Sequence, residues 1–491
     1  MRKIAIFSAY MLLIAAACTT TDNNEKSHIF IISTNDIHAN INSLPQLATL
    51  VDEYEERGEV ILVDSGDRVT GNAFIDDCPE PGVAMIELMN EVGYDVVTLG
   101  NHEFDKGPKI LQAMLDKADF EIVCANITTP TNYYDIEHYT YIDVNGIVIG
   151  IAGIVDTDNN GRPLGGESAL ADFGFTSDID CAYDTSTILA RQCDFAILLS
   201  HMGLTQDINL SGRDAHYDWI AGGHSHDVVG HRYGDSYISQ NGKNLRYVTI
   251  ADIEVTDDEI SSVSYHREAI DNEAADETIA AMVAEIKSRN PELNTIEGHA
   301  NALATQDGVA NFTIAALAAY PYADGFTPDV SLYHFGGIRL TNILPGDITR
   351  GDIYNNDPFL STIYIGELTT EQMSEFILRK YNSGTPDFPD KESHYPYIRT
   401  SVPYTILLGS EPQERPDATG IYFDLEEGIY RVAMCNYIAE NYIDADIVER
   451  QLRPTGITVR EAMLHYLHSL DEGLTPDNNV YQIEVSPNEL E

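Results

Sequence analysis

The sequence predicts a two-domain protein in which an α/β domain is followed by an α+β domain. From about residue 28 to residue 265, short apolar runs alternate with stretches of helical spacing, as in α/β layers. From about residue 296 onward, strands and helices mix without that alternation. A chain of 491 residues also exceeds one ordinary core, which agrees with two domains.

Apolar periodicity predicts the elements of the first domain. Met85, Leu88 and Val92 have the spacing of one helical face, which predicts a helix over residues 82–92. Further helices are expected over residues 44–56, 110–117 and 185–191. Strands are expected over residues 28–34, 59–63, 96–99, 119–125, 147–152, 195–199, 219–221 and 247–255.

A helical connector is expected over residues 266–295, because apolar residues recur at helical spacing from Ile279 to Ile286 and Pro291 ends the pattern. Residues 382–416 are rich in Pro, Asp and Ser and are expected to be a long surface excursion. The other elements expected beyond the connector are strands over 330–333 and 362–364 and helices over 370–380 and 459–468.

Five predicted strands end in the same kinds of polar side chain. Each apolar run is followed directly by Asp, Asn or His, as where Leu99 and Gly100 lead into Asn101 and His102. The carboxyl ends of parallel strands meet at one edge of a sheet, so these side chains converge if the strands share a sheet. The candidate metal ligands are Asp36, His38, Asp67, Asn101, His201, His224 and His226.

This mixture of imidazole, carboxylate and amide ligands suits two borderline divalent cations, such as Zn, Mn, Fe or Co. It suits Mg or Ca less well, because those ions prefer oxygen ligands. Two ions roughly 3.5 to 4 Å apart need a bridging carboxylate, and Asp67 is the natural candidate. Such a pair can lower the pKa of a bound water and bind the oxygens of a phosphoryl group.

The formal net charge of −51 argues against binding of a nucleic-acid polymer, which needs a basic face. The same charge would repel a small anionic substrate. Local positive charge from metals and a few Arg side chains must therefore overcome the overall field.

Residues 1–17 are expected to be a signal peptide of the lipoprotein type. A cationic start is followed by an apolar run that is too short for a roughly 20-residue membrane span. Cleavage before Cys18 and lipidation of its thiol would make an exported periplasmic or cell-envelope lipoprotein, in contact with the membrane only through this anchor. The alternative is an ordinary secretory signal with an incidental Cys.

The motifs D-x-H, G-D, G-N-H-E-F-D, S-H and G-H-x-H, in this order, resemble those of calcineurin-like metallophosphoesterases. More narrowly, the chain resembles the bacterial 5'-nucleotidase family, which includes UDP-sugar hydrolases and cyclic-nucleotide phosphodiesterases. The resemblance covers nearly the whole mature chain. It implies a four-layer α/β/β/α sandwich over residues 28–265 and a smaller 5'-nucleotidase-type substrate-specificity domain over residues 296–485.

The resemblance also implies a role for each residue of the first domain's site. His102 would face the phosphoryl group or the leaving oxygen as an electrostatic or acid catalyst, with Asp105 orienting its imidazole. Glu103 and Arg68 would support the structure. The implied ligand sets are Asp36, His38, Asp67 and His226 for one ion, and Asp67, Asn101, His201 and His224 for the other.

In the second domain the resemblance assigns substrate contacts. Arg339, in the run F-G-G-I-R, would clamp a phosphate or carboxylate. Phe359, after Pro358, would stack on the base, with Tyr437 as the second ring opposite it. His334 occupies a position that is often Asn, and its role stays open.

The second domain also departs from the family pattern. Leu360 and Ser361 replace the usual Gly-Asn after the stacking ring. A G-G-D-G turn is missing after Ala439, and so is a basic residue upstream of the G-G-I-R loop. The reaction type is therefore better specified than the substrate.

The expected function is hydrolysis of nucleotide phosphate esters, which releases nucleoside and phosphate as in nucleotide catabolism. One alternative is that the same centre acts on a UDP-sugar, a 2',3'-cyclic nucleotide or a sulfur ester. Another is a surface lipoprotein that binds nucleotides without chemistry. The full ligand set together with His102 argues against the second alternative.

Overall fold

The computed structural model describes residues 26–129, 134–157, 161–165, 169–384, 393–410 and 415–487. The predicted signal peptide and Cys18 lie outside these residues. Within the described ranges, no helix combines the length and apolar character needed to cross a membrane. The chain forms two compact units. The first comprises Met1–Val69 and Pro79–Ile286, and the second comprises Thr70–Cys78 and Lys287–Glu491.

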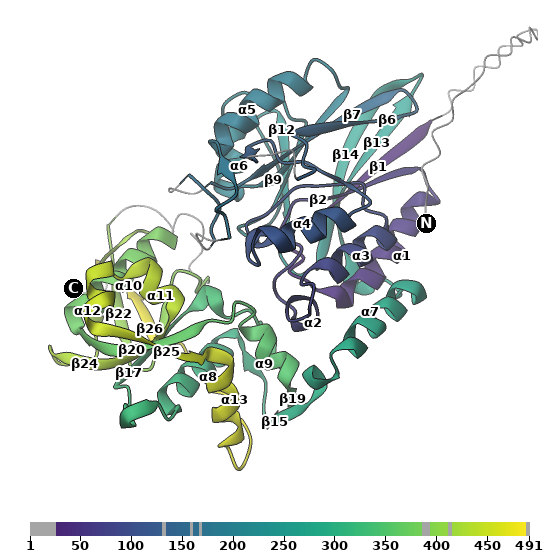
Figure 1. The fold of residues 1–491 in the computed structure, drawn as a ribbon. Coiled ribbons are helices and arrows are strands. Elements are labelled where there is room, and N and C mark those ends of the chain that lie inside the picture. The colour runs from purple at the N-terminus through teal and green to yellow at the C-terminus, as the bar shows by residue number, and fades with distance from the viewer. Residues whose placement is uncertain are drawn as a thin grey trace, which may run out of the picture. The chain divides into compact units, whose positions relative to one another are not determined.

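The strands of the first unit are β1 (Ser27–Thr34), β2 (Glu59–Asp64), β3 (Val96–Val97), β4 (Glu121–Ile122), β5 (Ile127–Thr128), β6 (Tyr139–Val144), β7 (Ile147–Val155), β8 (Gly174–Phe175), β9 (Phe195–His201), β10 (Trp219–Gly222), β11 (Val228–Tyr233), β12 (Ser236–Asn241), β13 (Tyr247–Thr256) and β14 (Glu259–Ala269). Its helices are α1 (Leu44–Glu55), α3 (Val83–Val92), α4 (Pro108–Lys117), α5 (Asp178–Leu189), α6 (Leu204–Ser211) and most of the connector helix α7 (Glu277–Arg289). Strands and helices alternate over the first part of the first unit, up to β4, whereas β4 to β8 and β10 to β14 are runs of consecutive strands (Figure 1).

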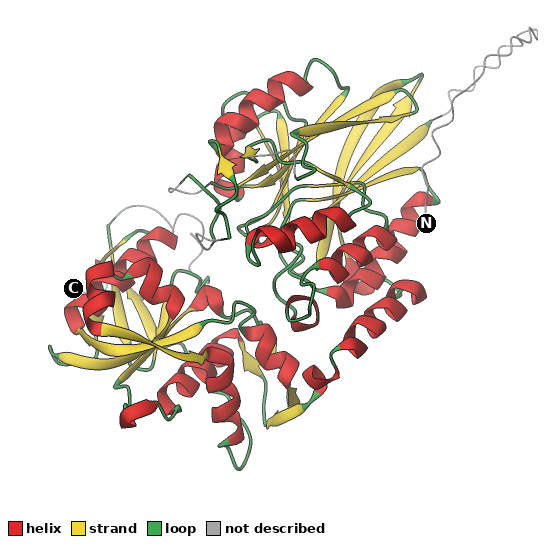
Figure 2. Cartoon of the chain, in the orientation of Figure 1, coloured by secondary structure: helices red, strands yellow, loops and turns green. Residues whose placement is uncertain are grey.

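The first unit is a sandwich of two six-stranded sheets, with strand orders β14-β13-β1-β2-β3-β4 and β11-β12-β10-β9-β7-β6. Ile31 and Ile61 of one sheet join Ile197 and Trp219 of the other in a single buried cluster. Helix α1 packs on β2 of the first sheet and helix α5 on β7 of the second (Figure 2). The four-layer α/β/β/α prediction is confirmed.

The predicted helices 44–56 and 82–92 are confirmed to within one residue by α1 and α3. Helix α5 begins at Asp178, seven residues before the predicted start. Its N-cap is Ser177, whose side chain accepts a hydrogen bond from the backbone N–H of Asp180. This cap lies upstream of the apolar periodicity from which the helix was predicted.

The second unit is an α+β fold (Figure 2). Its strands are β15 (Ile296–Ala300), β16 (Ala304–Thr305), β17 (Val330–His334), β18 (Asn342–Ile343), β19 (Gly346–Thr349), β20 (Thr362–Thr369), β21 (Ile398–Thr400), β22 (Tyr404–Leu408), β23 (Ala418–Phe423), β24 (Ile429–Cys435), β25 (Leu452–Thr458) and β26 (Gln482–Val485). Its helices are α2 (Ala73–Asp76), α8 (Gln306–Ala319), α9 (Arg350–Asn356), α10 (Thr370–Gly384), α11 (Asn436–Tyr442), α12 (Ala445–Gln451) and α13 (Val459–His468).

The expectation that residues 382–416 form only a surface excursion is wrong. Strands β21 and β22 come from this stretch, and the side chains of Arg399 and Arg415 are almost fully buried. Arg399 pairs with Asp307 and donates to the side chain of Gln482 at 2.7 Å. These polar partners allow charged side chains to be buried, although the composition is typical of a loop.

The segment Thr70–Cys78 belongs to the second unit although its neighbours in the sequence belong to the first. The carboxylate of Asp76 accepts hydrogen bonds from the backbone N–H groups of residues 70, 71 and 72. Asn355 accepts from the backbone of Ala73 at 2.7 Å, and Arg460 donates to Asp77 at 2.6 Å. The chain therefore passes from one unit to the other three times, after Val69, Cys78 and Ile286.

Candidate active site

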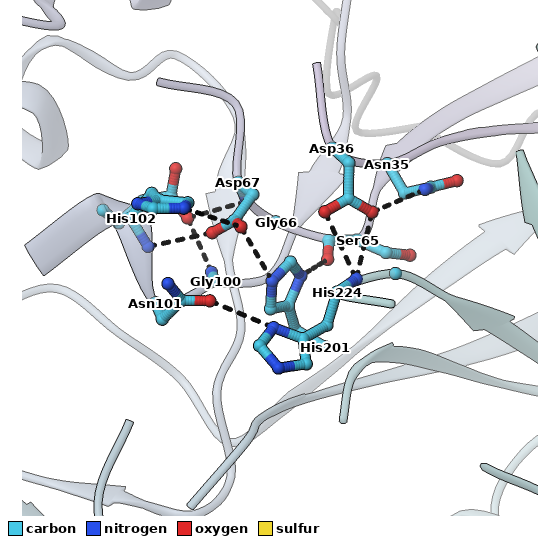
Figure 3. Close-up of polar contacts among 12 residues, drawn as sticks. Asn35, Asp36, Ser65, Gly66, Asp67, Gly100, Asn101, His102, His201 and His224 are labelled. Carbon is cyan, nitrogen blue, oxygen red and sulfur yellow. Dashed lines mark hydrogen bonds and ion pairs between the residues drawn. The ribbon is translucent and has the colours of Figure 1, made fainter. Parts of the chain in front are cut away.

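The strand order explains why the predicted ligands lie together. Strands β1, β2 and β3 are parallel neighbours in one sheet, and β9 and β10 are parallel neighbours in the other. Each ligand lies at or just after the carboxyl end of one of these strands. The side chains of Asp36, Asp67, Asn101, His201 and His224 point toward one another (Figure 3).

Five of the seven candidate ligands have a left-handed backbone, which non-glycine residues rarely adopt. Hydrogen bonds between the ligand loops hold this conformation. Asp36 donates its backbone N–H to the carbonyl of Gly66 at 3.0 Å, and His38 donates to the carbonyl of Asp67 at 2.9 Å. Strain held by surrounding structure is typical of functional sites. The φ angles are 49° for Asp36, 47° for His38, 55° for Asp67, 75° for His224 and 60° for His226.

Asp36, His38 and His226 form the first group of ligand atoms. The Nε2 atoms of His38 and His226 lie 3.1 Å apart, and they lie 3.8 and 3.4 Å from Oδ1 of Asp36. Asp36 is also an acceptor for Asn35 Nδ2 at 2.7 Å and for the backbone N–H of His224. Two imidazole nitrogens directed at each other beside a buried carboxylate fit ligands that share one cation.

Asp67, Asn101, His201 and His224 form the second group. Nε2 of His201 lies 3.2 Å from Oδ2 of Asp67, and Nδ1 of His224 lies 3.1 Å from Oδ1 of Asn101. The other ring nitrogen of His201 donates to the carbonyl of Ser65 at 2.7 Å. This bond places the His201 proton on Nδ1 and directs the lone pair of Nε2 toward Asp67, as metal-ligating imidazoles require.

The charges around His201 also fit a cation. Burial lowers the pKa of its imidazole, but the charges of Asp67 and Asp36 outweigh burial and raise this pKa to about 10 when only protein groups surround it. Nε2 of His201 is buried and has no hydrogen-bond partner among the described residues. A bound cation would satisfy this nitrogen and balance the two carboxylates.

His102 lies beside the two groups of ligands. Its Nδ1 lies 2.7 Å from Oδ2 of Asp105, its Nε2 lies 3.8 Å from Oδ2 of Asp67, and its backbone N–H donates to Oδ1 of Asp67. The ligand atoms of His38, Asp67 and His102 also lie within 4.8 Å of one another, so the geometry alone permits His102 to be a ligand. The carboxylate of Asp105 therefore contacts the ring nitrogen of His102 that faces away from Asp67.

Glu103 and Arg68 support the loops that carry the ligands. The buried carboxylate of Glu103 accepts hydrogen bonds from the backbone N–H groups of Asp67, Arg68 and Gly100, at 2.9, 3.0 and 2.6 Å. The Arg68 side chain in turn donates to Asp64 at 3.1 Å. Glu103 thereby fixes the loop of Asp67 against the loop of Asn101.

The candidate substrate residues of the second unit form two pairs. The guanidinium of Arg339 lies 5.7 Å from the ring centroid of Phe359. The rings of His334 and Tyr437 lie 4.3 Å apart, so His334 packs on the ring that was predicted to stack on a base. Burial, followed by the charges of Lys380 and Arg339, lowers the pKa of His334 to about 3, which keeps this imidazole neutral.

Comparisons with known proteins agree with this architecture. Residues 31–228 match the calcineurin-like phosphoesterase family and residues 282–448 match the 5'-nucleotidase C-terminal domain. The chain is 24% identical to the trifunctional nucleotide phosphoesterase YfkN of Bacillus subtilis over 87% of its own length. It is 24% identical to a 5'-nucleotidase of Vibrio vulnificus, over 67% of this chain and 70% of that protein.

The chain spans only 34% of the YfkN sequence. Among solved structures, a 5'-nucleotidase precursor from Thermus thermophilus shares the fold. The TM-score is 0.77, with 20% identity over 93% of this chain and 99% of that one. Both domain families are matched in order, so the chain carries a calcineurin-like phosphoesterase domain followed by a 5'-nucleotidase C-terminal domain.

Proposed function

We propose that this protein hydrolyses nucleotide phosphate esters with the help of two divalent metal ions, and that Asp67 would be a ligand of both ions. Asp67 shares one group of possible ligand atoms with His38 and His102 and another with His201 and His224, and this supports the proposal most directly. Zn, Mn or a similar ion suits this ligand set. Metals bound here would lower the pKa of a water molecule and offset the negative charge of the phosphoryl group.

The residues around the metal groups would orient and protonate the substrate. Asp105 accepts the Nδ1 proton of His102 and so favours the protonated imidazole. The proton on Nε2 of His102 is then available to a phosphoryl oxygen or to the leaving oxygen. Glu103 keeps Asp67 in place through backbone hydrogen bonds and makes no contact with substrate in this proposal.

The second unit would recognise the rest of the nucleotide. Arg339 offers a bidentate cation for a phosphate or carboxylate, and Phe359 offers a partly exposed ring for a base. The ring of Tyr437 packs against His334, so Tyr437 would support His334 rather than act as a free second ring that stacks on the base. The proposal therefore gives Arg339 and Phe359 the main substrate contacts.

We also infer export and a lipid anchor at Cys18, from the cationic and apolar start of the sequence. The protein should then incorporate a radioactive fatty acid in cells, and the Cys18→Ser variant should not. Equal labelling of the variant would place any acyl group elsewhere and contradict the lipoprotein assignment.

The proposed function is tested by phosphate release from the purified mature protein with added Mn or Zn. The substrates are AMP, UMP, UDP-glucose, 2',3'-cyclic AMP and p-nitrophenyl phosphate. We expect the nucleoside monophosphates to have the highest kcat/KM. Preference for UDP-glucose or the cyclic nucleotide would reassign the substrate within the same chemistry. Tight AMP binding without turnover of any substrate would overturn the hydrolase assignment.

A further inference from the structure

Leu360 has a backbone conformation that is unusual for its residue type. Its φ angle is 55°, in the left-handed region, where a leucine side chain is strained. In the described chain, the other non-glycine residues in this region are mostly candidate metal ligands or Asn and Asp, which tolerate it. Leu245 shares the conformation but is only 3% exposed, so core packing offsets its strain.

The side chain of Leu360 has no such compensation from the core. It is 48% exposed, and the neighbouring Phe359 is 37% exposed, so one turn carries two consecutive large apolar side chains that solvent reaches, the projecting pair. Removing either from water would be favourable, yet the fold leaves both accessible. A strained residue that adds little to the core is a candidate for function.

Buried polar groups force the turn into this shape. The carboxylate of Asp357 accepts hydrogen bonds from the backbone N–H and the hydroxyl of Ser361, at 3.0 and 2.7 Å. The carbonyl of Asp357 accepts from Nε of Arg460 at 2.7 Å. Asp357 and Ser361 are both buried, so the chain is held before Pro358 and directly after Leu360.

A positive charge lies beside the projecting pair. The guanidinium of Arg339 is 5.7 Å from the centroid of the Phe359 ring, and the backbone N–H of Arg339 donates to the carbonyl of Asn356 at the start of the same turn. A rigid apolar tip next to a cation is complementary to a molecule with a flat aromatic part and an anionic part.

We propose that Leu360 is a specificity-determining residue that, together with Phe359, holds the aromatic part of the leaving group. It would favour phosphate esters of aromatic-bearing alcohols, such as nucleosides, over esters of aliphatic alcohols. This inference rests on the proposed function and deepens it. Phe359 would contact the face of the aromatic ring, and Leu360 would cover the edge of that ring. Because the turn is already ordered in the free protein, binding would not cost the entropy of ordering it.

Two substitutions separate the side chain of Leu360 from its backbone strain. Leu360→Ala removes the apolar contact and keeps a side chain in the left-handed region, whereas Leu360→Gly removes both the contact and the strain. Leu344→Ala is the matched control, because Leu344 is an equally apolar and more exposed residue of the same unit, at 68% exposure.

The experiment compares kcat/KM for AMP and for glycerol 1-phosphate in the wild type and the three variants. Loss of the Leu360 methyl groups that the bound aromatic part would cover should lower kcat/KM for AMP about five- to tenfold in both Leu360 variants, mainly through KM. The value for glycerol 1-phosphate should not change. Leu360→Gly should also raise the Tm, while Leu360→Ala and Leu344→Ala should leave it near the wild-type value.

Calorimetric binding of adenosine in the presence of a chelator keeps the test independent of catalysis. The Leu360 variants should bind adenosine several-fold more weakly than the wild type. If the wild type hydrolyses no ester but binds adenosine more tightly than the Leu360 variants do, the proposed function fails and the role of Leu360 stands. If AMP, glycerol phosphate and adenosine all respond alike to the substitutions, or do not respond, the role of Leu360 is overturned.

Discussion

Replacing Asp67 with asparagine should remove metal and phosphatase activity together. The amide keeps the shape of the side chain but loses its negative charge and one oxygen lone-pair donor. Asp67 belongs both to the group with His38 and His102 and to the group with His201 and His224. Its carboxylate lies 3.2 Å from His201 and 3.8 Å from His102, inside a buried site where charge is weakly screened. We expect kcat/KM to fall about 10³-fold or more.

Metal content by mass spectrometry and phosphate release from AMP are the two measurements. Asp95→Asn is a matched control, because the Asp95 carboxylate also accepts a backbone N–H in the same sheet, from Leu62 at 2.9 Å, but contributes no ligand atom to the groups. The control should keep both metal and activity. An Asp67→Asn protein that retains two metals and full turnover would contradict the bridging role.

Replacing His102 with alanine should lower kcat while leaving the metal content unchanged. Proton transfer by a positioned side chain is worth about 10²- to 10⁴-fold, and His102 holds its Nε2 near Asp67 with Asp105 behind it. If His102 protonates the leaving oxygen, the loss should be larger for AMP than for p-nitrophenyl phosphate, since p-nitrophenolate leaves readily without a proton.

The two possible roles of His102 give different results in this experiment. Its Nε2 also lies within reach of His38 and Asp67, so a ligand role predicts loss of one metal from the variant. A catalytic role predicts full metal content and a leaving-group-dependent loss of kcat. Asp105→Asn should show a smaller loss of about 10- to 100-fold, because it removes only the partner that orients the ring.

The sequence could predict that the candidate ligands lie together because each signal is local. An apolar run followed by Asp, Asn or His marks the end of a strand, and parallel strands bring such ends to one edge. The contacts that hold these ligands are not local. Glu103 binds the backbone of Asp67, and Ser65 binds the ring of His201, across 36 and 136 residues of chain. Every residue other than proline has the same backbone N–H and C=O groups, so the sequence does not show which of these groups a side chain will bind.

Composition is a poor guide to burial where polar residues have partners. Residues 382–416 were expected at the surface, yet Arg399 and Arg415 of this stretch are buried beside Asp307 and Glu484. A polar residue is expected at the surface because burying it without a partner costs free energy. The partners of these two Arg residues lie more than 65 residues away in the sequence, so local composition does not reveal them. The strained turn at Leu360 was equally hidden, because φ angles appear only in the folded chain.

The chain crosses between the two units three times, and this limits how the second unit can be expressed alone or transferred to another protein. A polypeptide that starts at Lys287 would lack residues 70–78. It would leave the buried guanidinium of Arg460 without Asp77, and Asn355 without its bond to Ala73. A gene fusion or domain swap made at the connector helix would transfer an incomplete unit. The complete second unit is therefore discontinuous in the sequence. Its N-terminal segment, residues 70–78, lies within the region that matches the phosphoesterase family.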